Sequence, residues 1–158
     1  MNRCLPRVLF GLYLIMLQPL MAAEEHCTFR VHAQANENDG DVFASPVTMP
    51  ISGKQIFVEK IPVVSEHDVA AFRAMPAADG SFGALIELNE HGRLALEAVS
   101  TEHRGSTLLV LVNGRAVTEL LVDRAVSDGR IYLPSGLARS DIEIMNKDWP
   151  QIGRHKHR

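Results

Sequence analysis

The stretch STLLVLVNGRAVTELLV, residues 106–122, constrains the fold more than any other part of the chain. Apolar residues occupy positions 108–112, Asn113-Gly114 follows, and a second mostly apolar run begins after Arg115. Both central positions of a type I′ turn need positive φ, which asparagine and glycine tolerate best. An Asn-Gly pair between two apolar runs therefore predicts a β-hairpin.

The N-terminus has the order of a secretory signal peptide, which we assign to residues 1–23. Arg3 and Arg7 form a positive start, residues 8–17 form an uncharged apolar core, and small residues precede the predicted cleavage after Ala23. The core is shorter than the roughly 20 residues that a membrane span needs. We expect a periplasmic or secreted protein; an uncleaved N-terminal anchor is the alternative.

The charge of the exported chain argues against nucleic acid and anionic membranes as partners. The whole chain carries a net charge of −3, which becomes −5 once Arg3 and Arg7 leave with the signal peptide. Binding to nucleic acid depends on a basic surface that neutralises phosphates. We expect no nucleic acid and no membrane span after cleavage.

Cys27 is the one cysteine left after cleavage, so the exported chain has no internal disulfide. It begins an alternating run, residues 27–35, that is typical of a half-buried strand. We expect Cys27 to be a buried apolar residue. Pairing with another chain and a reactive thiol are the alternatives.

Hydrophobic periodicity predicts the remaining elements of one domain, residues 24–150. Strands are expected at residues 27–35, 42–49, 55–60, 82–88, 108–112 and 130–134, with a return strand after the Asn-Gly turn; residues 36–41 are expected to form a loop. We expect an α+β fold: a mainly antiparallel sheet with two main helices packed on one face and a short C-terminal helix. Residues 151–158 are predicted to form a disordered basic tail.

The three helices are predicted from their caps and apolar faces. The first runs from Ser65 as N-cap to Pro76, with Val69, Phe72 and Met75 on one face. The second runs from Asn89 to about His103, ends at Gly105, and buries the stripe Leu94, Ala95, Ala98 and Val99. The third opens with a capping box, Ser140 to Glu143, and buries Ile142 and Met145.

The order of these elements from residue 82 to residue 142 resembles the head subdomain of the first periplasmic domain of SecD, the protein-export accessory subunit. Gly92 matches the helix start of that pattern, and Thr101 with Gly105 matches its end. Asn113-Gly114 and Asp128-Gly129 match the two turns. Residues 59–72 resemble the strand-to-helix entry that precedes the subdomain.

The resemblance divides the domain into N-terminal strands, residues 27–60, and a SecD-like part, residues 61–148. The chain departs from the SecD pattern at Asn113, where the family usually carries aspartate, and at Leu120, where it usually carries proline. No transmembrane segments follow, so we expect a free-standing, exported copy of the head. Within the hairpin unit, residues 108–112 are then expected to form an inner strand, buried by the helix that carries Leu94 and Val99.

The resemblance implies a binding role, because the SecD head is thought to contact emerging polypeptide. We expect a non-catalytic interaction domain whose outer strand or hairpin tip, Asn113, Gly114 and Arg115, contacts an extended polypeptide or another envelope protein. No cofactor, catalytic residue or metal site is predicted, because zinc-ligand spacing and a nucleophile elbow are both missing. The alternative is a small exported hydrolase or metal-dependent enzyme whose site is assembled from distant residues.

Overall fold

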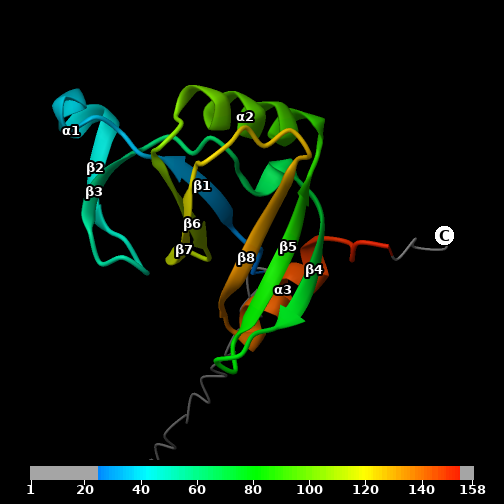
Figure 1. Cartoon of the computed structure of the whole chain (residues 1–158). Coiled ribbons are helices and arrows are strands. Elements are labelled where there is room, and N and C mark those ends of the chain that lie inside the picture. The colour runs from blue at the N-terminus through cyan, green and yellow to red at the C-terminus, as the bar shows by residue number, and fades with distance from the viewer. Residues whose placement is uncertain (1–24, 154–158) are drawn as a thin grey trace, which may run out of the picture.

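The computed structural model describes residues 25–153, so the predicted signal peptide and residues 154–158 of the predicted tail lie outside the described residues. The fold is α+β, as predicted (Figure 1). In chain order its helices and strands are β1 (Phe29–Ala33), α1 (Gly40–Phe43), β2 (Ala44–Thr48), β3 (Gln55–Glu59), β4 (Val69–Pro76), β5 (Phe82–Leu88), α2 (Glu90–Glu102), β6 (Thr107–Val112), β7 (Arg115–Leu121), β8 (Arg130–Leu137) and α3 (Arg139–Asp148). Short 3-10 turns, Glu37–Asp39 and Glu66–Asp68, precede α1 and β4.

The strands form three small antiparallel sheets rather than one. Their strand orders are β1-β6-β7, β2-β3 and β4-β5-β8. The prediction that residues 108–112 form an inner strand is confirmed, because β6 lies between β1 and β7. The Asn-Gly turn is also confirmed: φ is +49° at Asn113 and +73° at Gly114.

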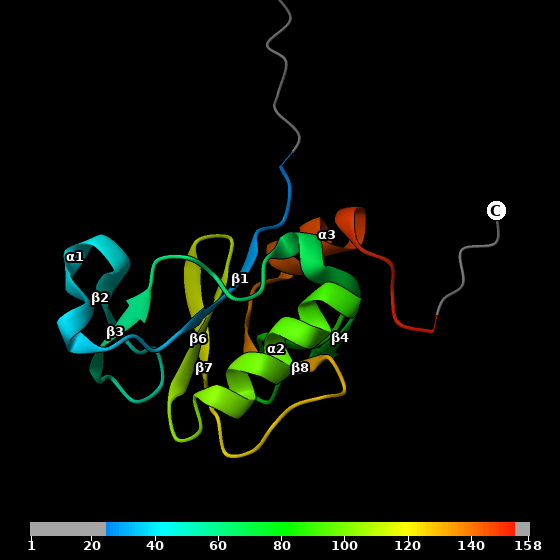
Figure 2. The ribbon, with the colours of Figure 1, turned by 90° about the horizontal axis from the view of Figure 1, so that it is seen from above.

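The central strand β6 is buried on both faces. Leu108 and Val110 point into the main core, which also contains Val99 of α2. Leu109 points the other way and packs with Val58 in a second, smaller cluster under the β2–β3 hairpin. Figures 1 and 2 show the resulting arrangement: α2 lies over the β-sheets, the β2–β3 hairpin lies beyond β6 and β7, and α3 lies at the opposite end from α2.

The predicted helix between Ser65 and Pro76 is wrong. Ser65 caps only the 3-10 turn, in which the Asp68 carboxylate accepts hydrogen bonds from the Ser65 amide and hydroxyl groups. The chain then becomes β4, which pairs with β5 through a β-bulge between Val69 and Ala71. The bulge inserts one residue, so Val69 and Phe72 both face the core although they are three positions apart. The helical spacing of the buried residues Val69 and Phe72 therefore arises from a strand with a β-bulge and not from a helix.

The predicted buried stripe of the helix over 89–103 is partly wrong. The helix forms, and Val99 is buried, but Leu94 is 51% exposed. The buried positions are instead Gly92, Leu96, Val99 and Ser100, which follow an equally helical spacing. Gly92 explains which face of the helix is buried. A Cβ at Gly92 would lie 2.7 Å from Asp68 Cβ, so the glycine allows the helix to approach its neighbours on that side.

The capping box predicted at Ser140 begins two residues earlier. The N-cap of α3 is Ala138, whose amide donates to the Asp141 carboxylate at 2.8 Å. Met145 is buried as predicted, whereas Ile142 is only half-buried.

The ordered chain continues past Pro150, the predicted end of the domain. The Phe72 amide donates to the carbonyl of Pro150, and the Ile152 amide donates to the carbonyl of Phe72, so this segment pairs with the outer edge of β4. Trp149 contacts the Phe72 ring edge-on at 6.4 Å between ring centroids. Residues 151 and 152 therefore belong to the domain and not to the tail.

Cys27 is buried, as predicted. Burial raises the pKa of its thiol to about 12, and the nearby Asp148 carboxylate adds to the shift. The Asp148 carboxylate also accepts a hydrogen bond from the Cys27 amide at 2.6 Å, which fastens the start of the described chain to α3. A thiol in this state is mostly protonated at neutral pH and is a poor nucleophile.

Among the described residues, no helix is long and apolar enough to cross a membrane.

Candidate functional site

Two sheet edges lie next to each other on the side of the molecule away from β1. β7 is an edge strand of one sheet and β8 an edge strand of another, and the two lie side by side without being paired. The two strands are in tight contact at Gly136 of β8, where an added Cβ would lie 3.1 Å from Val117 Cγ1 and 3.2 Å from the Val117 carbonyl oxygen.

A hollow of 280 Å³ is lined by the end of β7, the start of β8 and the loop that joins these two strands. We call it the β7–β8 groove. Among its lining residues, Leu96, Leu108 and Ile131 are buried, whereas Leu121 is 68% and Tyr132 is 56% exposed. The groove thus combines an apolar lining, two exposed large side chains and two strand edges, which are the features that an extended peptide uses when it adds to a sheet.

Charged side chains lie at the rim of the groove. Asp123, Arg124 and Arg130 line it and are exposed, and none of the three forms a described ion pair. The rim is therefore polar while the interior is apolar, as in most peptide and ligand sites.

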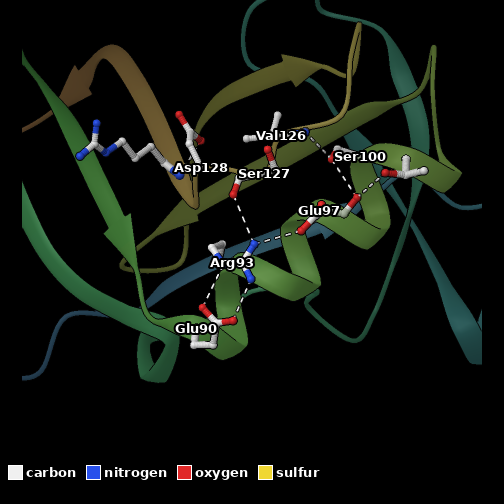
Figure 3. A network of polar contacts seen from close by, with 9 residues as sticks. Glu90, Arg93, Glu97, Ser100, Val126, Ser127 and Asp128 are labelled. Atoms are coloured by element: carbon white, nitrogen blue, oxygen red, sulfur yellow. Dashed lines mark hydrogen bonds and ion pairs between the residues drawn. The ribbon is translucent and has the colours of Figure 1, made fainter.

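A polar network on α2 holds the loop over the groove in place (Figure 3). The Arg93 guanidinium forms ion pairs with Glu90 at 2.7 Å and Glu97 at 3.0 Å, and donates a long hydrogen bond, 3.4 Å, to the Ser127 carbonyl. The hydrogen bond from Arg93 lowers the pKa of the Glu90 carboxyl. The Arg93 side chain also lies close to Gly129 at the end of the loop: a Cβ added to Gly129 would lie 2.9 Å from Arg93 Cγ.

Ser100 provides a second, buried attachment for the same loop. Its hydroxyl donates to the Glu97 carbonyl at 3.1 Å and accepts from the Val126 amide at 2.8 Å (Figure 3). Ser100 is 1% exposed, and Val126 packs against the main core. The loop is thus fixed to α2 at two points, so the groove is formed before any ligand arrives.

The hairpin tip, which the sequence predicts to be a contact surface, is tied to two other elements. The Asn113 carboxamide accepts from the Thr28 amide at 3.1 Å and donates to Asp141 at 2.8 Å. Arg115 donates to the same Asp141 carboxylate at 2.5 Å, and that carboxylate also accepts from Ala138 at the start of α3. We call these contacts the Asp141 clamp.

The clamp gives a physical reason for asparagine at position 113. An aspartate there accepts from Thr28 equally well but cannot donate to Asp141, and it places two carboxylates face to face. Gly114 and Arg115 remain exposed at the tip. A partner-binding role for Asn113, Gly114 and Arg115 stays a prediction.

Two histidines form the histidine–aspartate contacts that the enzyme alternative requires. His26 lies 3.0 Å from Asp148, and His91 lies 2.7 Å from Asp68. The second pair has a serine beside it, but the Ser65 hydroxyl donates to Asp68 and not to His91. A catalytic histidine must contact the nucleophile that it deprotonates, so this arrangement lacks the geometry of a triad.

The potential metal ligands do not converge among residues 25–153: no group of three or more histidine, cysteine, aspartate or glutamate side chains is placed to hold an ion there. His26, His32, His67, His91 and His103 all belong to this part of the chain.

A second exposed apolar surface lies at the other side of the molecule. Val42 and Phe43 of α1 and Ile61 after β3 are all exposed around a hollow of 480 Å³. This hollow is larger than the β7–β8 groove, and it is lined by residues of α1, of the turn before it and of the end of the β2–β3 hairpin.

The residues of the groove were not identified from the sequence. One signal for Leu121 was available: in a strand, neighbouring side chains point to opposite faces, so Leu120 and Leu121 cannot both enter the same core. Leu120 packs against the main core and Leu121 does not. Tyr132 offers no comparable signal, because the path of β8 beside β7 is a tertiary feature.

The described chain is therefore an α+β domain with antiparallel sheets and a groove between two sheet edges. Its fold is similar to that of SecDF, as the resemblance predicts: one SecDF structure, from a study of a membrane component that enhances protein export, aligns with a TM-score of 0.54 at 13% identity and covers 84% of this chain and 70% of that one. A SecDF structure in its Super-membrane-facing form aligns with a TM-score of 0.46 at 13% identity, covering 80% of this chain and 29% of that one. No protein-family model and no curated protein sequence matches the chain.

Proposed function

We propose that this protein is a non-catalytic, exported domain that binds an extended polypeptide segment in the β7–β8 groove. The observation that carries the proposal is the groove itself, with Leu121 and Tyr132 exposed beside two unpaired strand edges. A peptide that adds to an edge gains main-chain hydrogen bonds whatever its sequence, and apolar side pockets add affinity. Such a mode suits a protein that meets many different polypeptides.

The fold similarity supports an export-related role for this binding. The SecDF protein whose fold is similar is a membrane component that enhances protein export. A shared fold does not by itself imply a shared function. The residues expected to bind polypeptide are therefore taken from the β7–β8 groove and not from the similarity to SecDF.

The histidine–aspartate contacts lack the arrangement of a catalytic triad. His91 contacts Asp68, whose other oxygen accepts from Ser65, so the carboxylate lies between the two residues that a triad brings together.

We expect Leu121→Asp to weaken polypeptide binding at least about tenfold, because burial of a leucine side chain contributes about 1.5–3 kcal/mol and about 1.4 kcal/mol is a factor of ten. The measurement is fluorescence anisotropy of a fluorescein-labelled, chemically unfolded and carboxymethylated secretory protein, titrated with protein purified from cells that export it. Leu94→Asp is the matched control, since Leu94 is also an exposed leucine but lies on α2 outside the groove.

The control must bind as the wild type does. Equal loss of binding in both variants indicates a non-specific apolar effect and contradicts the proposal, as does unchanged binding by Leu121→Asp.

A further inference from the structure

Asn113 is the one asparagine of the chain that is followed by glycine, and it lies at an exposed hairpin tip. The other asparagines, at positions 2, 36, 38, 89 and 146, are followed by Arg, Glu, Asp, Glu and Lys, respectively. A following side chain hinders attack of the next backbone nitrogen on the asparagine carboxamide, whereas glycine does not. Gly114 also has open space around it, with no atom within 4 Å of an added Cβ.

We propose that Asn113 is a deamidation site, that the Asp141 clamp protects it in the folded protein, and that its reaction permanently opens the clamp. The proposal concerns the hairpin tip and is independent of polypeptide binding in the β7–β8 groove.

The reaction needs only water and balances as follows. The Gly114 nitrogen loses its proton to hydroxide and bonds to Asn113 Cγ, and the side-chain nitrogen leaves as ammonia after taking a proton from water. Water then opens the cyclic imide at either carbonyl group. The product at position 113 is aspartate or isoaspartate.

The folded structure opposes the attack at both ends of the carboxamide. Its oxygen accepts from the Thr28 amide at 3.1 Å, and its nitrogen donates to Asp141 at 2.8 Å. The Asn113 amide is itself bonded to the Thr28 carbonyl at 2.9 Å. Cγ therefore cannot turn toward the Gly114 nitrogen until the tip separates from Thr28 and α3, so reaction requires local opening.

The product cannot restore the clamp. A carboxylate at position 113 has no proton to donate, and it faces the Asp141 carboxylate, which is 4% exposed. Isoaspartate also adds a methylene group to the backbone of a turn in which φ is +49° at this residue. Each deamidated molecule therefore has a less stable junction between the hairpin, the N-terminal segment and α3.

The test compares deamidation in the folded and the urea-unfolded protein, both purified from cells that export it and held in the same mildly alkaline buffer. Trypsin releases residues 105–115 as one peptide that contains Asn113 and no other amide side chain, so mass spectrometry reads this site alone. We expect the unfolded chain to deamidate at Asn113 faster than at its other asparagines. The folded chain should react at least about tenfold more slowly, since opening breaks a hydrogen bond to a charged group.

The deamidated protein is then separated from the unreacted protein by ion exchange. Its unfolding in urea is compared with that of an Asn113→Asp variant. We expect both to unfold at a lower urea concentration than the wild type. Equal rates in the folded and unfolded chains, faster reaction at another asparagine, or a product as stable as the wild type would overturn the proposal.

Discussion

Gly83→Ala should lose about 3 kcal/mol of unfolding free energy or more, because overpacking a site with no room costs about 1–3 kcal/mol and the neighbours here are backbone atoms. A Cβ at position 83 would lie 2.5 Å from the Leu133 carbonyl oxygen and 2.6 Å from the Pro134 carbonyl oxygen. These atoms belong to β8, which pairs with β5 through a register shift between Phe82 and Ala84. β8 cannot move away without giving up that pairing.

Urea unfolding measures the loss at Gly83, and Gly80→Ala is its control. Gly80 has φ of +82° and no atom within 4 Å of an added Cβ, so alanine there meets backbone strain without a clash. Strain of this kind costs about 1–2 kcal/mol. If Gly83→Ala is no less stable than Gly80→Ala, the close approach of β5 and β8 is wrong.

Asp141→Ala should destabilise the protein by about 3 kcal/mol. Removing one partner of a buried charged network typically costs about 3–5 kcal/mol. The lower end of this range applies because the Arg115 side chain is half exposed. Asp141 is 4% exposed and is the acceptor for Asn113, Arg115 and the Ala138 amide. Its loss removes the cap of α3 and leaves the Asn113 side-chain nitrogen without its partner. We expect the unfolding midpoint in urea to fall accordingly.

Asp128→Ala is the matched control for Asp141. Asp128 is exposed and accepts a single hydrogen bond from the Arg130 amide at 3.1 Å, so its replacement should cost about 0.5–1.5 kcal/mol at most. A double-mutant cycle with Arg115→Ala separates the ion pair from the cap. Losses of equal size at the two aspartates would contradict the role given to the clamp.

The hairpin and α2 could be predicted from the sequence because their signals are local. Asn113-Gly114 specifies the turn through backbone conformation, and Asn89 caps α2 by accepting from the Gly92 amide. Neither feature depends on what lies elsewhere in the fold.

β4 could not be predicted because a tertiary feature mimics a local one. Its bulge places Val69 and Phe72 on one face at a spacing that also fits a helix. The segment is instead held by β5 on one side and by Pro150 and Ile152 on the other. Tertiary pairing of this kind overrides intrinsic helix propensity.

The candidate site was the least predictable part. The sequence pointed to the outer strand or the tip of the hairpin, and the groove does border the outer strand β7. Its second wall, β8, lies beside β7 through a tertiary contact between Gly136 and Val117 that no local pattern indicates. The position of the Asn113 side chain in the clamp depends on its hydrogen bond to Asp141, which is 28 residues away in the chain. No local sequence pattern predicts this pair.

The measurement that tests the central claim most directly is a map of backbone amide shifts on addition of the unfolded, carboxymethylated secretory protein. Binding by edge addition predicts shifts concentrated at the open end of the groove, in residues 118–124 of β7 and its following loop and residues 130–133 of β8. A spectrum that does not change contradicts polypeptide binding. Shifts confined to the surface formed by Val42, Phe43 and Ile61 would show that binding occurs elsewhere and that the β7–β8 groove is not the site.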